Sequence, residues 1–414
     1  MGFDCLKCMG KHYSKPLKCG HSYCPIMSKV KSLQGKKLEK KDFQGTAPGV
    51  FVGRYNYPKI NVGILAPPEK IEKDAELYEA PNEWSKRNFE IDDVLKFRSV
   101  IINSSFQSYV KTNNSKFLST SQEVAMSSKP VDLEFNLDKK PHYNVKTSDV
   151  ETVMGARAEL KKAIMQENPK IDKKVDYVVS DNDLKSVGAL SILYKKGYDE
   201  NFLTNLLSIG TLGLKTQRKL VPTRWSITAV DDTLGKDLIN EVKDFKEIDY
   251  KLYFGGYLGN YYLILFFPRV WSFELFEMYM PDTLWNPNTE LKVMTDHEFY
   301  EGRKNYADNC VGGYYATRIG ILEKFKKSKR QGAVIVLRFI TNEYSMPLGV
   351  WVVREATRKA LENEKEFDSK EEMLKYAKDL VMKKFKYNMD MTLKTSKVYD
   401  HINKQRTLKD FFKA

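Results

Sequence analysis

The sequence predicts an α+β fold, in which a mixed or antiparallel sheet core is flanked by helices. Short apolar runs bounded by Gly and Pro, which are typical of strands, occur over residues 50–66 and 250–280. Segments with helical periodicity and capping residues occur elsewhere along the chain. Because strands and helices are mixed, and residues 250–280 predict an antiparallel ladder, α+β describes the chain best.

The composition is that of a folded, basic protein. The chain has 414 residues, of which 42% are hydrophobic and 12% aromatic, so it can form two or three domains with sizeable cores. The formal net charge of +14 favours polyanionic partners such as DNA. The longest apolar run, Tyr261 to Val270, is too short for a membrane span and contains Pro268. We therefore expect a cytoplasmic protein with no membrane partner.

Four regions follow one another along the chain. Residues 1–27 are predicted to form a zinc-binding module and residues 28–49 a basic connector. Residues 50–386 form the α+β body, with a division into two subdomains near residues 110–145. Residues 387–414 are polar and rich in Lys, and they are predicted to be a flexible tail.

The first half of the body should begin with a hairpin. VFVGR (50–54) and INVGIL (60–65) are predicted strands around the turn YNYPK, and IDDVLKFRSVIINS (91–104) is a predicted helix. Residues 110–130 are predicted to be an irregular surface excursion. Ser148 and Glu151 form a capping-box pattern that should open a helix ending before Pro169.

The second half should contain most of the sheet. RWSITAV (224–230) is a predicted strand, and KLYFGGYLGNYYLILFF (251–267) predicts two strands around a Gly-rich turn. The remaining predictions are a strand over VWSFELFEMYM (270–280), a helix over residues 312–327, a buried strand over AVIVLRFI (333–340), a strand running into a helix over residues 348–361, and a helix from the cap Ser369–Glu372 to Phe385.

Four of the five cysteines lie within the first 24 residues. Cys5 and Cys8 form one pair, and Cys19 and Cys24 form a second. Clustered Cys pairs in a large intracellular chain favour zinc over disulfides, and four protein ligands close the site, so the Zn²⁺ would be structural. His21 could replace Cys19 or Cys24 as a ligand. Cys310 is isolated and is predicted to be a buried thiol.

The chain ends in NKQRTLKDFFKA. Gln405, Leu408, Phe411 and Phe412 fit the pattern Q-x-x-[LIM]-x-x-[FY]-[FY], which resembles the peptide that binds the DNA sliding clamp (PCNA). In one tight helical turn the three apolar side chains would form a plug for a preformed groove, and Gln405 would bind separately. The alternative is an amphipathic end that docks on its own domain.

The chain resembles the archaeal Nre family (NreA type) of DNA repair proteins. The resemblance is carried by CGHSYCP, PGVFVGRYNYPKINVGILAPPE, KLVPTRWSITAVDDTLGKDL, GGYYATRIGILE, GAVIVLRFITNEYSMPLGVWVVRE and the terminal motif. It implies a role in repair of DNA damage and binding to the sliding clamp. It also implies that Cys5, Cys8, Cys19 and Cys24 hold zinc, and that Gln405, Leu408, Phe411 and Phe412 contact the clamp.

One stretch has the residues expected of an active site. If RWSITAV is a strand, Asp231 and Asp232 lie at its end, where paired carboxylates could bind Mg²⁺ or Mn²⁺ or act as acid and base. Arg224 could contact a phosphate. The structural alternative is that an Asp at such a turn caps the next helix.

Two other stretches could contact DNA. Arg54 and Tyr57 lie in a turn, where an Arg among aromatic residues suits base stacking and a phosphate contact. Tyr315 and Arg318 lie on a predicted helix that begins with two glycines. Ordinary loop and packing roles would also account for these residues.

These observations lead to two hypotheses from different classes. The first is a DNA repair factor that binds damaged DNA and is recruited to the sliding clamp. The second is an enzyme, a metal-dependent nuclease or phosphodiesterase or another hydrolase of nucleotide groups, that uses Asp231, Asp232 and Arg224. An RNA-binding zinc protein is a third, weaker alternative.

Overall fold

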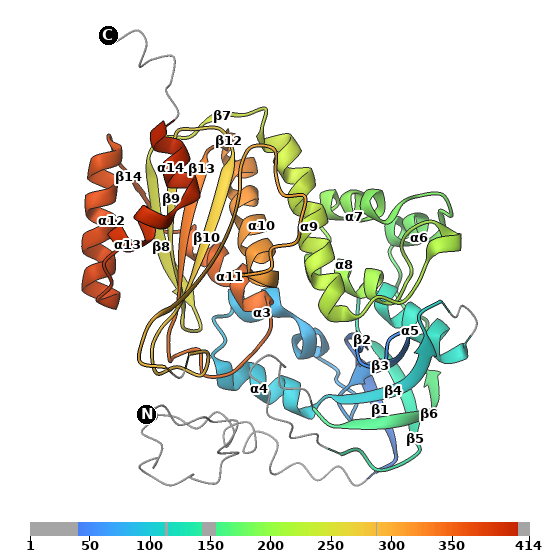
Figure 1. The fold of residues 1–414 in the computed structure, drawn as a ribbon. Helices are drawn as coiled ribbons and strands as arrows, with labels where there is room; N and C mark the ends of the chain where they lie inside the picture. Colours follow the sequence, from blue (N-terminus) through green and yellow to red (C-terminus); the bar gives the residue numbers. More distant parts are fainter. Residues whose placement is uncertain (1–39, 112–114, 143–154, 287, 405–414) are drawn as a thin grey trace, which may run out of the picture. The chain divides into compact units, whose positions relative to one another are not determined.

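The computed structural model describes residues 40–111, 115–142, 155–286 and 288–404 (Figure 1). They form two compact units. The amino-terminal unit contains the described residues up to Leu234 together with Met346–Gly349, and the carboxy-terminal unit contains the others. The predicted subdomain break near residues 110–145 therefore lies inside the first unit. The Cys cluster and the terminal motif lie outside the described residues.

The amino-terminal unit is built on a six-stranded sheet in the order β1-β5-β6-β4-β3-β2. All its pairings are antiparallel except β4–β6, which is parallel. The strands are β1 (Asp42–Ala47), β2 (Gly49–Val52), β3 (Lys59–Ala66), β4 (Ile102–Tyr109), β5 (Val131–Leu137) and β6 (Arg157–Met165).

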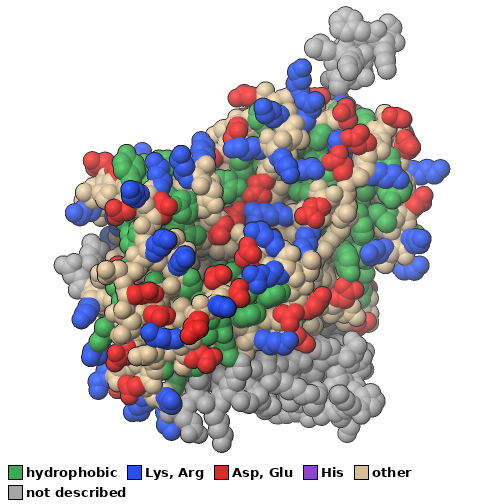
Figure 2. All heavy atoms as spheres, turned by 180° about the vertical axis from the view of Figure 1, so that it is seen from behind, with side chains coloured by type: hydrophobic (Ala, Val, Ile, Leu, Met, Phe, Trp, Pro, Cys, Tyr) green, Lys and Arg blue, Asp and Glu red, His purple; other side chains and the backbone are tan. Residues whose placement is uncertain are grey.

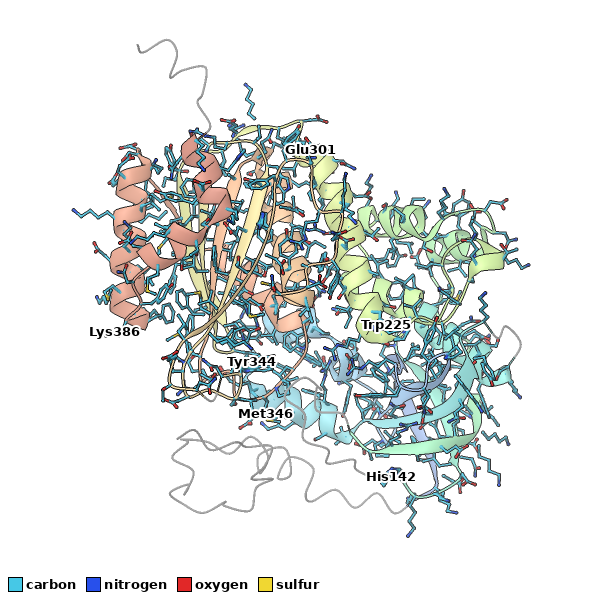
Figure 3. The ribbon with its side chains drawn as sticks, in the orientation of Figure 1. His142, Trp225, Glu301, Tyr344, Met346 and Lys386 are labelled. Carbon is cyan, nitrogen blue, oxygen red and sulfur yellow. The ribbon has the colours of Figure 1, made fainter. Side chains whose placement is uncertain are left out.

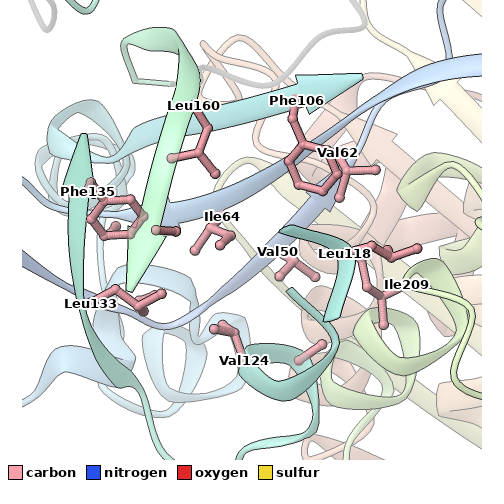
Figure 4. Close-up of a cluster of buried hydrophobic side chains, with 14 of the residues drawn as sticks. Val50, Val62, Ile64, Phe106, Leu118, Val124, Leu133, Phe135, Leu160 and Ile209 are labelled. Carbon is pink, nitrogen blue, oxygen red and sulfur yellow. The ribbon is translucent and has the colours of Figure 1, made fainter. Parts of the chain in front are cut away.

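Alternate residues of these strands form the core of this unit (Figure 4). On β3, Ile60, Val62 and Ile64 are completely buried, and the residues between them point outward. Helix α5 (Lys116–Met126) adds Leu118 and Val124 to the same cluster. Burial of one strand face fixes the pairing register, because a slip of one residue would expose every core side chain.

Short helices complete this unit and begin at recognisable caps. The Asp199 carboxylate accepts from the backbone N–H groups of Asn201 and Phe202, both at 2.9 Å. The helices are η1 (Ala75–Glu79), α3 (Pro81–Lys86), α4 (Ile91–Val100), α6 (Lys173–Ser180), α7 (Ser186–Lys195), α8 (Glu200–Ser208) and η2 (Lys215–Gln217). Helix α9 (Thr223–Val242) begins in this unit and runs into the next along the chain.

The carboxy-terminal unit contains a second six-stranded sheet, in the order β11-β10-β13-β9-β8-β14. Only β10–β13 is parallel. The strands are β8 (Lys251–Tyr257), β9 (Asn260–Phe267), β10 (Ser272–Tyr279), β11 (Lys292–Glu298), β13 (Ala333–Ile340) and β14 (Glu364–Glu366), and β7 (Lys246–Glu247) pairs separately with β12 (Arg330–Gln331).

Helices cover both faces of this sheet (Figure 1). Helices α10 (Val311–Ser328) and α11 (Trp351–Ala360) cover one face, where Phe325 lies 4.5 Å from the ring of Phe266. The other face packs against α12 (Lys370–Phe385), α13 (Asp390–Thr395) and α14 (Lys397–Lys404). Strands buried on both faces explain the almost continuous apolar runs of β9 and β13.

Several predicted elements are confirmed. The β2–β3 hairpin, the β8–β9 hairpin, strands β10 and β13 and helices α10 and α12 lie where the patterns place them. The Ser369 hydroxyl accepts from the Glu372 backbone N–H at 3.2 Å, as the predicted cap requires. The α+β class is also confirmed. Strand β10, however, pairs with β13 and β11, so the antiparallel ladder over residues 250–280 is limited to β8 and β9.

Other predictions are wrong. RWSITAV belongs to helix α9. Its β-branched residues prefer a strand, but the helix buries one apolar face, on which Val230, Leu234, Leu238 and Val242 follow one another at intervals of four residues. The burial of this face outweighs the local preference. Residues 110–130 contain α5. The helix expected after Ser148 is strand β6, whose residues alternate between core and solvent. The caps at Ser148 and Glu151 lie outside the described residues.

Two element boundaries also differ from prediction. The helix expected over residues 91–104 ends at Val100, and β4 begins at Ile102. Residues 348–350 form no strand before α11. Residues 387–404, which were predicted to belong to a flexible tail, contain α13 and α14 instead, and their Leu393, Val398 and Ile402 pack on the sheet. Among the helices that the structure describes, none is long and apolar enough to cross a membrane.

Candidate nucleic-acid interface

The turn between β2 and β3 presents two aromatic side chains to solvent. The Gly53 N–H donates to the Asn61 carbonyl at 2.8 Å, and the Lys59 N–H donates to the Asn56 carbonyl at 2.9 Å. Asn56 adopts a left-handed conformation with φ of 65°, which Asn tolerates in turns. Tyr55 and Tyr57 are 60% and 48% exposed at the tip of this closed turn.

The beginning of α9 lies against the same turn. The Val52 N–H donates to the Thr223 hydroxyl at 2.9 Å, which joins the end of β2 to the first turn of the helix. This contact brings Trp225 to Tyr57, with ring centroids 5.6 Å apart and planes tilted by 46°. Trp225 stays 47% exposed at the start of α9 (Figure 3). The two rings form an exposed aromatic pair on a rigid support.

Cationic side chains lie close to this pair in the chain. The Arg54 guanidinium lies 5.1 Å from the Tyr55 ring, and Arg224 is exposed beside Trp225. The Lys59 ammonium lies 5.9 Å from the ring of Tyr109, which is 56% exposed. We call the group of Arg54, Tyr55, Tyr57, Lys59, Tyr109, Arg224 and Trp225 the aromatic–basic surface.

This surface has the chemistry needed to bind unpaired bases and phosphates. Aromatic faces stack on bases, and Arg and Lys contact the backbone. Charge alone would be a weaker indication, because Figure 2 shows Lys and Arg interspersed with Asp and Glu over the face that it presents. The combination of exposed rings with adjacent cations is therefore the more specific feature.

The predicted catalytic group has a different geometry from the one expected. Asp231 and Asp232 lie in the middle of α9, not at a strand end, and Asp231 is completely buried. Arg224 precedes Asp231 by two helical turns, or about 10 Å. The predicted placement of the two carboxylates at a strand end is therefore wrong. Among the residues described, no three His, Cys, Asp or Glu side chains are grouped so that they could hold a metal ion.

Tyr315 and Arg318 lie on α10 in the carboxy-terminal unit and point inward. Arg318 is 1% exposed and donates to Glu298 at 2.9 Å. The Tyr315 hydroxyl accepts from the Ala307 N–H at 2.9 Å. These contacts favour a structural role for both residues. They belong to a different unit from the aromatic–basic surface.

Asp296 on β11 and Cys310, which directly precedes α10, also have structural partners. Asp296 accepts from the backbone N–H groups of Asn309 and Cys310 at 3.0 and 2.8 Å and pairs with Arg303 at 3.1 Å. Cys310 is a buried thiol, as predicted. Burial, together with the charges of Glu277 and Asp296, raises the pKa of this thiol well above its usual value.

Sequence reasoning identified Arg54, Tyr57 and Arg224 but placed them in separate sites. It missed Lys59, Tyr109 and Trp225 as functional candidates. Pro222 and Thr223 are typical of a helix start, and Arg224 and Trp225 follow them directly. If the segment had been recognised as a helix start, this pattern would have indicated that Trp225 is exposed next to a cation.

Comparison with known families gives two matches that together span most of the chain. The description "Archaeal Nre, N-terminal" matches residues 18–286, and "Archaeal Nre, C-terminal" matches residues 298–411. Apart from residues 288–297, the described residues fall within these ranges. No solved structure matches the chain.

The chain is also similar to individual proteins from archaea. It is 39% identical to "DNA repair protein NreA" of Haloferax volcanii over 342 residues, and this alignment covers 80% of each chain. It is 38% identical over 376 residues to "DNA repair protein NreB" of Archaeoglobus fulgidus, which covers 90% of this chain and 92% of that protein. The match to "DNA repair protein NreA" of the same organism is 35% identical over 374 residues.

Proposed function

Because this chain belongs to the archaeal Nre family, we propose that it is a DNA repair protein that binds damaged DNA through the aromatic–basic surface. Its relatives are named DNA repair proteins, which supports the repair role. The exposed pair of Tyr57 and Trp225 is the observation that carries the proposed binding site.

The pair suits DNA whose bases are no longer fully stacked. Bases of intact duplex are covered by their neighbours, whereas bases in single strands and at distorted lesions can stack on a protein ring. Arg54, beside Tyr55 in the same turn, and the exposed Arg224, next to Trp225 in the chain, would contact phosphates. The first-turn N–H groups of α9 add positive potential at the same place.

We propose that the termini supply recruitment and a metal module. Gln405, Leu408, Phe411 and Phe412 would bind the sliding clamp (PCNA), and tethering would raise the local concentration of the protein on DNA without new DNA contacts. Cys5, Cys8, Cys19 and Cys24 would hold a structural Zn²⁺, with His21 as an alternative to Cys19 or Cys24.

DNA binding can be tested by fluorescence anisotropy with an end-labelled single strand and the matching duplex. The Tyr57→Ala, Trp225→Ala variant should lose about 1–3 kcal/mol of single-strand affinity, since each stacked base contributes about that much. Tyr177→Ala is the matched control, because Tyr177 is 60% exposed beside Lys174 on α6 of the same unit. Wild-type affinity in the double variant would contradict the proposal.

The terminal motif can be tested by removing residues 405–414, which begin just after α14. Clamp binding in a pull-down should disappear, and the melting temperature should stay unchanged. A large thermal loss would instead favour docking of the motif on its own domain. Elemental analysis of purified protein tests the zinc module. A molar ratio of zinc to protein near zero would show that the four cysteines do not hold zinc.

A hydrolase function has no comparable support. It depended on Asp231 and Asp232 at a strand end, and both lie within α9. Incubation of damaged and undamaged DNA with the protein and Mg²⁺ or Mn²⁺ is the direct test. The enzyme hypothesis would be supported if wild type cleaved DNA and a folded Asp231→Ala, Asp232→Ala variant did not.

A further inference from the structure

The outer face of the amino-terminal sheet carries a polar pocket that the proposed function does not use. It has a volume of about 270 Å³ and lies over β3, β4 and β6. Six of its eight lining residues are polar, namely Asn61, Ser105, Gln107, His142, Arg157 and Glu159. His142, labelled in Figure 3, comes from the segment that follows β5.

Strand register explains why these side chains meet. Asn61 is paired with Gln107 across β3 and β4, and Ser105 is paired with Glu159 across β4 and β6. These positions alternate with core residues such as Val62 and Phe106, so they share the outward face. His142 exchanges two backbone hydrogen bonds with Arg157, at 3.0 and 2.9 Å, which holds it at the edge of the pocket.

The pocket offers donors and acceptors in similar numbers. The Arg157 Nε donates to the Ser105 hydroxyl at 3.0 Å, which orients the guanidinium. No described residue accepts a hydrogen bond from its two terminal nitrogens. Asn61 and Gln107 each provide an amide donor and acceptor, and Glu159 provides only acceptors. Because Arg157 and Glu159 offset each other, the site suits an uncharged polar heterocycle better than a phosphate or an apolar ligand.

The size of the pocket further limits the class of ligand that it can hold. Pockets for drug-sized ligands are about 300–1,000 Å³, so a volume of about 270 Å³ suits a single base or nucleoside. Phe106 and Ala158 also border the pocket, although both belong to the buried core cluster on the other face of the sheet. Enzymes and binding proteins commonly read an unstacked base by hydrogen bonds to its edge in a pocket of this kind.

The pocket is continuous with the aromatic–basic surface along the strands. The pair Lys59–Tyr109 is the next outward row after Asn61–Gln107, about 7 Å away. Tyr57 precedes Lys59 by two residues and leads to Trp225. A strand of DNA that stacks on these rings would therefore be carried toward the pocket.

We infer that this pocket receives one base of the DNA strand held by the aromatic–basic surface and distinguishes among bases by hydrogen bonds from Gln107, His142 and Arg157. The inference rests on the proposed function, since it needs the strand to be bound there. Stacking on Tyr57 and Trp225 tolerates any base, whereas amide, imidazole and guanidinium groups do not.

The experiment compares affinity for dA, dC and dT strands of about 12 nucleotides, a typical site size for single-strand binding folds. Full-length wild type should prefer one base by about tenfold, as expected for a well-placed polar contact. Gln107→Ala with His142→Ala should reduce that preference below about threefold. Tyr57→Ala should weaken all three strands alike. Gln44→Ala is the matched control, because Gln44 is exposed on β1 of the same sheet and lies outside the pocket.

Each outcome decides between the two ideas. The pocket inference would be overturned if wild type bound all three strands equally tightly, or if the pocket variant lost the same affinity for each of them. Either result would leave the proposed function intact. Failure of wild type to bind any strand would overturn both. If the double variant melts early, Gln107→Glu serves instead, since it keeps the shape and exchanges an amide donor for an acceptor. It should then change the order of preference, and an unchanged order would overturn the inference.

Discussion

The Tyr57 and Trp225 rings lie 5.6 Å apart, although one belongs to a hairpin turn and the other to the first turn of a helix. Both are about half exposed, so neither is explained by burial in a core. The Val52 N–H donates to the Thr223 hydroxyl, which ties the end of the strand to the start of the helix next to this ring contact.

The first prediction concerns coupling between these rings. Because they form one stacking platform, Tyr57→Ala and Trp225→Ala should be non-additive in single-strand affinity, with a coupling energy of about 0.5 kcal/mol or more. A double-mutant cycle by anisotropy measures it. The cycle of Tyr57→Ala with Tyr177→Ala should be additive, since Tyr177 lies on α6. Additivity in both cycles would show that the rings act separately.

The second prediction concerns the attachment of α14 to the sheet. Glu274, fully buried on β10, accepts from the Ser396 hydroxyl and from the N–H groups of Lys397 and Val398, the latter two at 3.0 Å. Glu274→Ala should lower the free energy of unfolding by about 3 kcal/mol, because charged hydrogen bonds are lost and buried donors are left unsatisfied. Urea denaturation measures this loss.

Hydrogen exchange gives the local test of the same contact. Amide protection in α14 should fall in Glu274→Ala more than in the rest of the unit. Asp400→Ala is the control, since its ion pair with Lys404 is exposed and should contribute less than about 0.5 kcal/mol. Equal stability of the two variants would rule out an anchoring role for Glu274.

The third prediction concerns a buried charge pair inside the carboxy-terminal sheet. Arg338 on β13 pairs with Glu277 on β10 and donates to the Asn260 side chain at 3.0 and 2.6 Å. Glu277→Ala should cost about 3–5 kcal/mol, because it leaves a buried guanidinium without its counter-charge. Replacing Glu277 and Arg338 together with Leu should cost less, as chemical denaturation would reveal. A double replacement that is worse than the single one would contradict this interpretation.

The fourth prediction concerns stability at low pH. Burial would raise the pKa of Glu364, but hydrogen bonds from Lys251, Tyr253 and Lys324 outweigh it and lower the pKa to about 2. A carboxyl group whose pKa is lowered on folding stabilises the folded state at every pH above its ordinary pKa of 4.5. This stabilisation is lost as the pH falls from 4.5 to about 2.

Glu364→Gln should therefore be less stable than wild type at pH 7, by about 1 kcal/mol after screening by solvent. The difference should shrink as the pH falls through that window, as thermal melts at several pH values would measure. Glu366→Gln should have a smaller effect, because Glu366 pairs with Lys251 but is 67% exposed. A difference that does not depend on pH would exclude the carboxylate as the cause.

Local patterns predicted those parts of the fold that depend on near neighbours. The cap at Ser369, the Gly-rich turn between β8 and β9, and the buried run of β13 each carry their signal within a few residues. The placement of Arg54 and Tyr57 in a turn was predicted in the same way, since the turn between β2 and β3 is local. The patterns failed at β6 and α9, where partners far along the chain decide between helix and strand.

The amino-acid sequence alone was enough to identify the family, the α+β class and three residues of the aromatic–basic surface, Arg54, Tyr57 and Arg224. It could not order the strands, because β10 pairs with β13 across an intervening helix and not with β9 beside it in the chain. It could not bring Trp225 to Tyr57, or Gln107 to Arg157 and His142, because those approaches follow from sheet register and helix packing. Such contacts are non-local, and their free energy comes from burying a whole core at once.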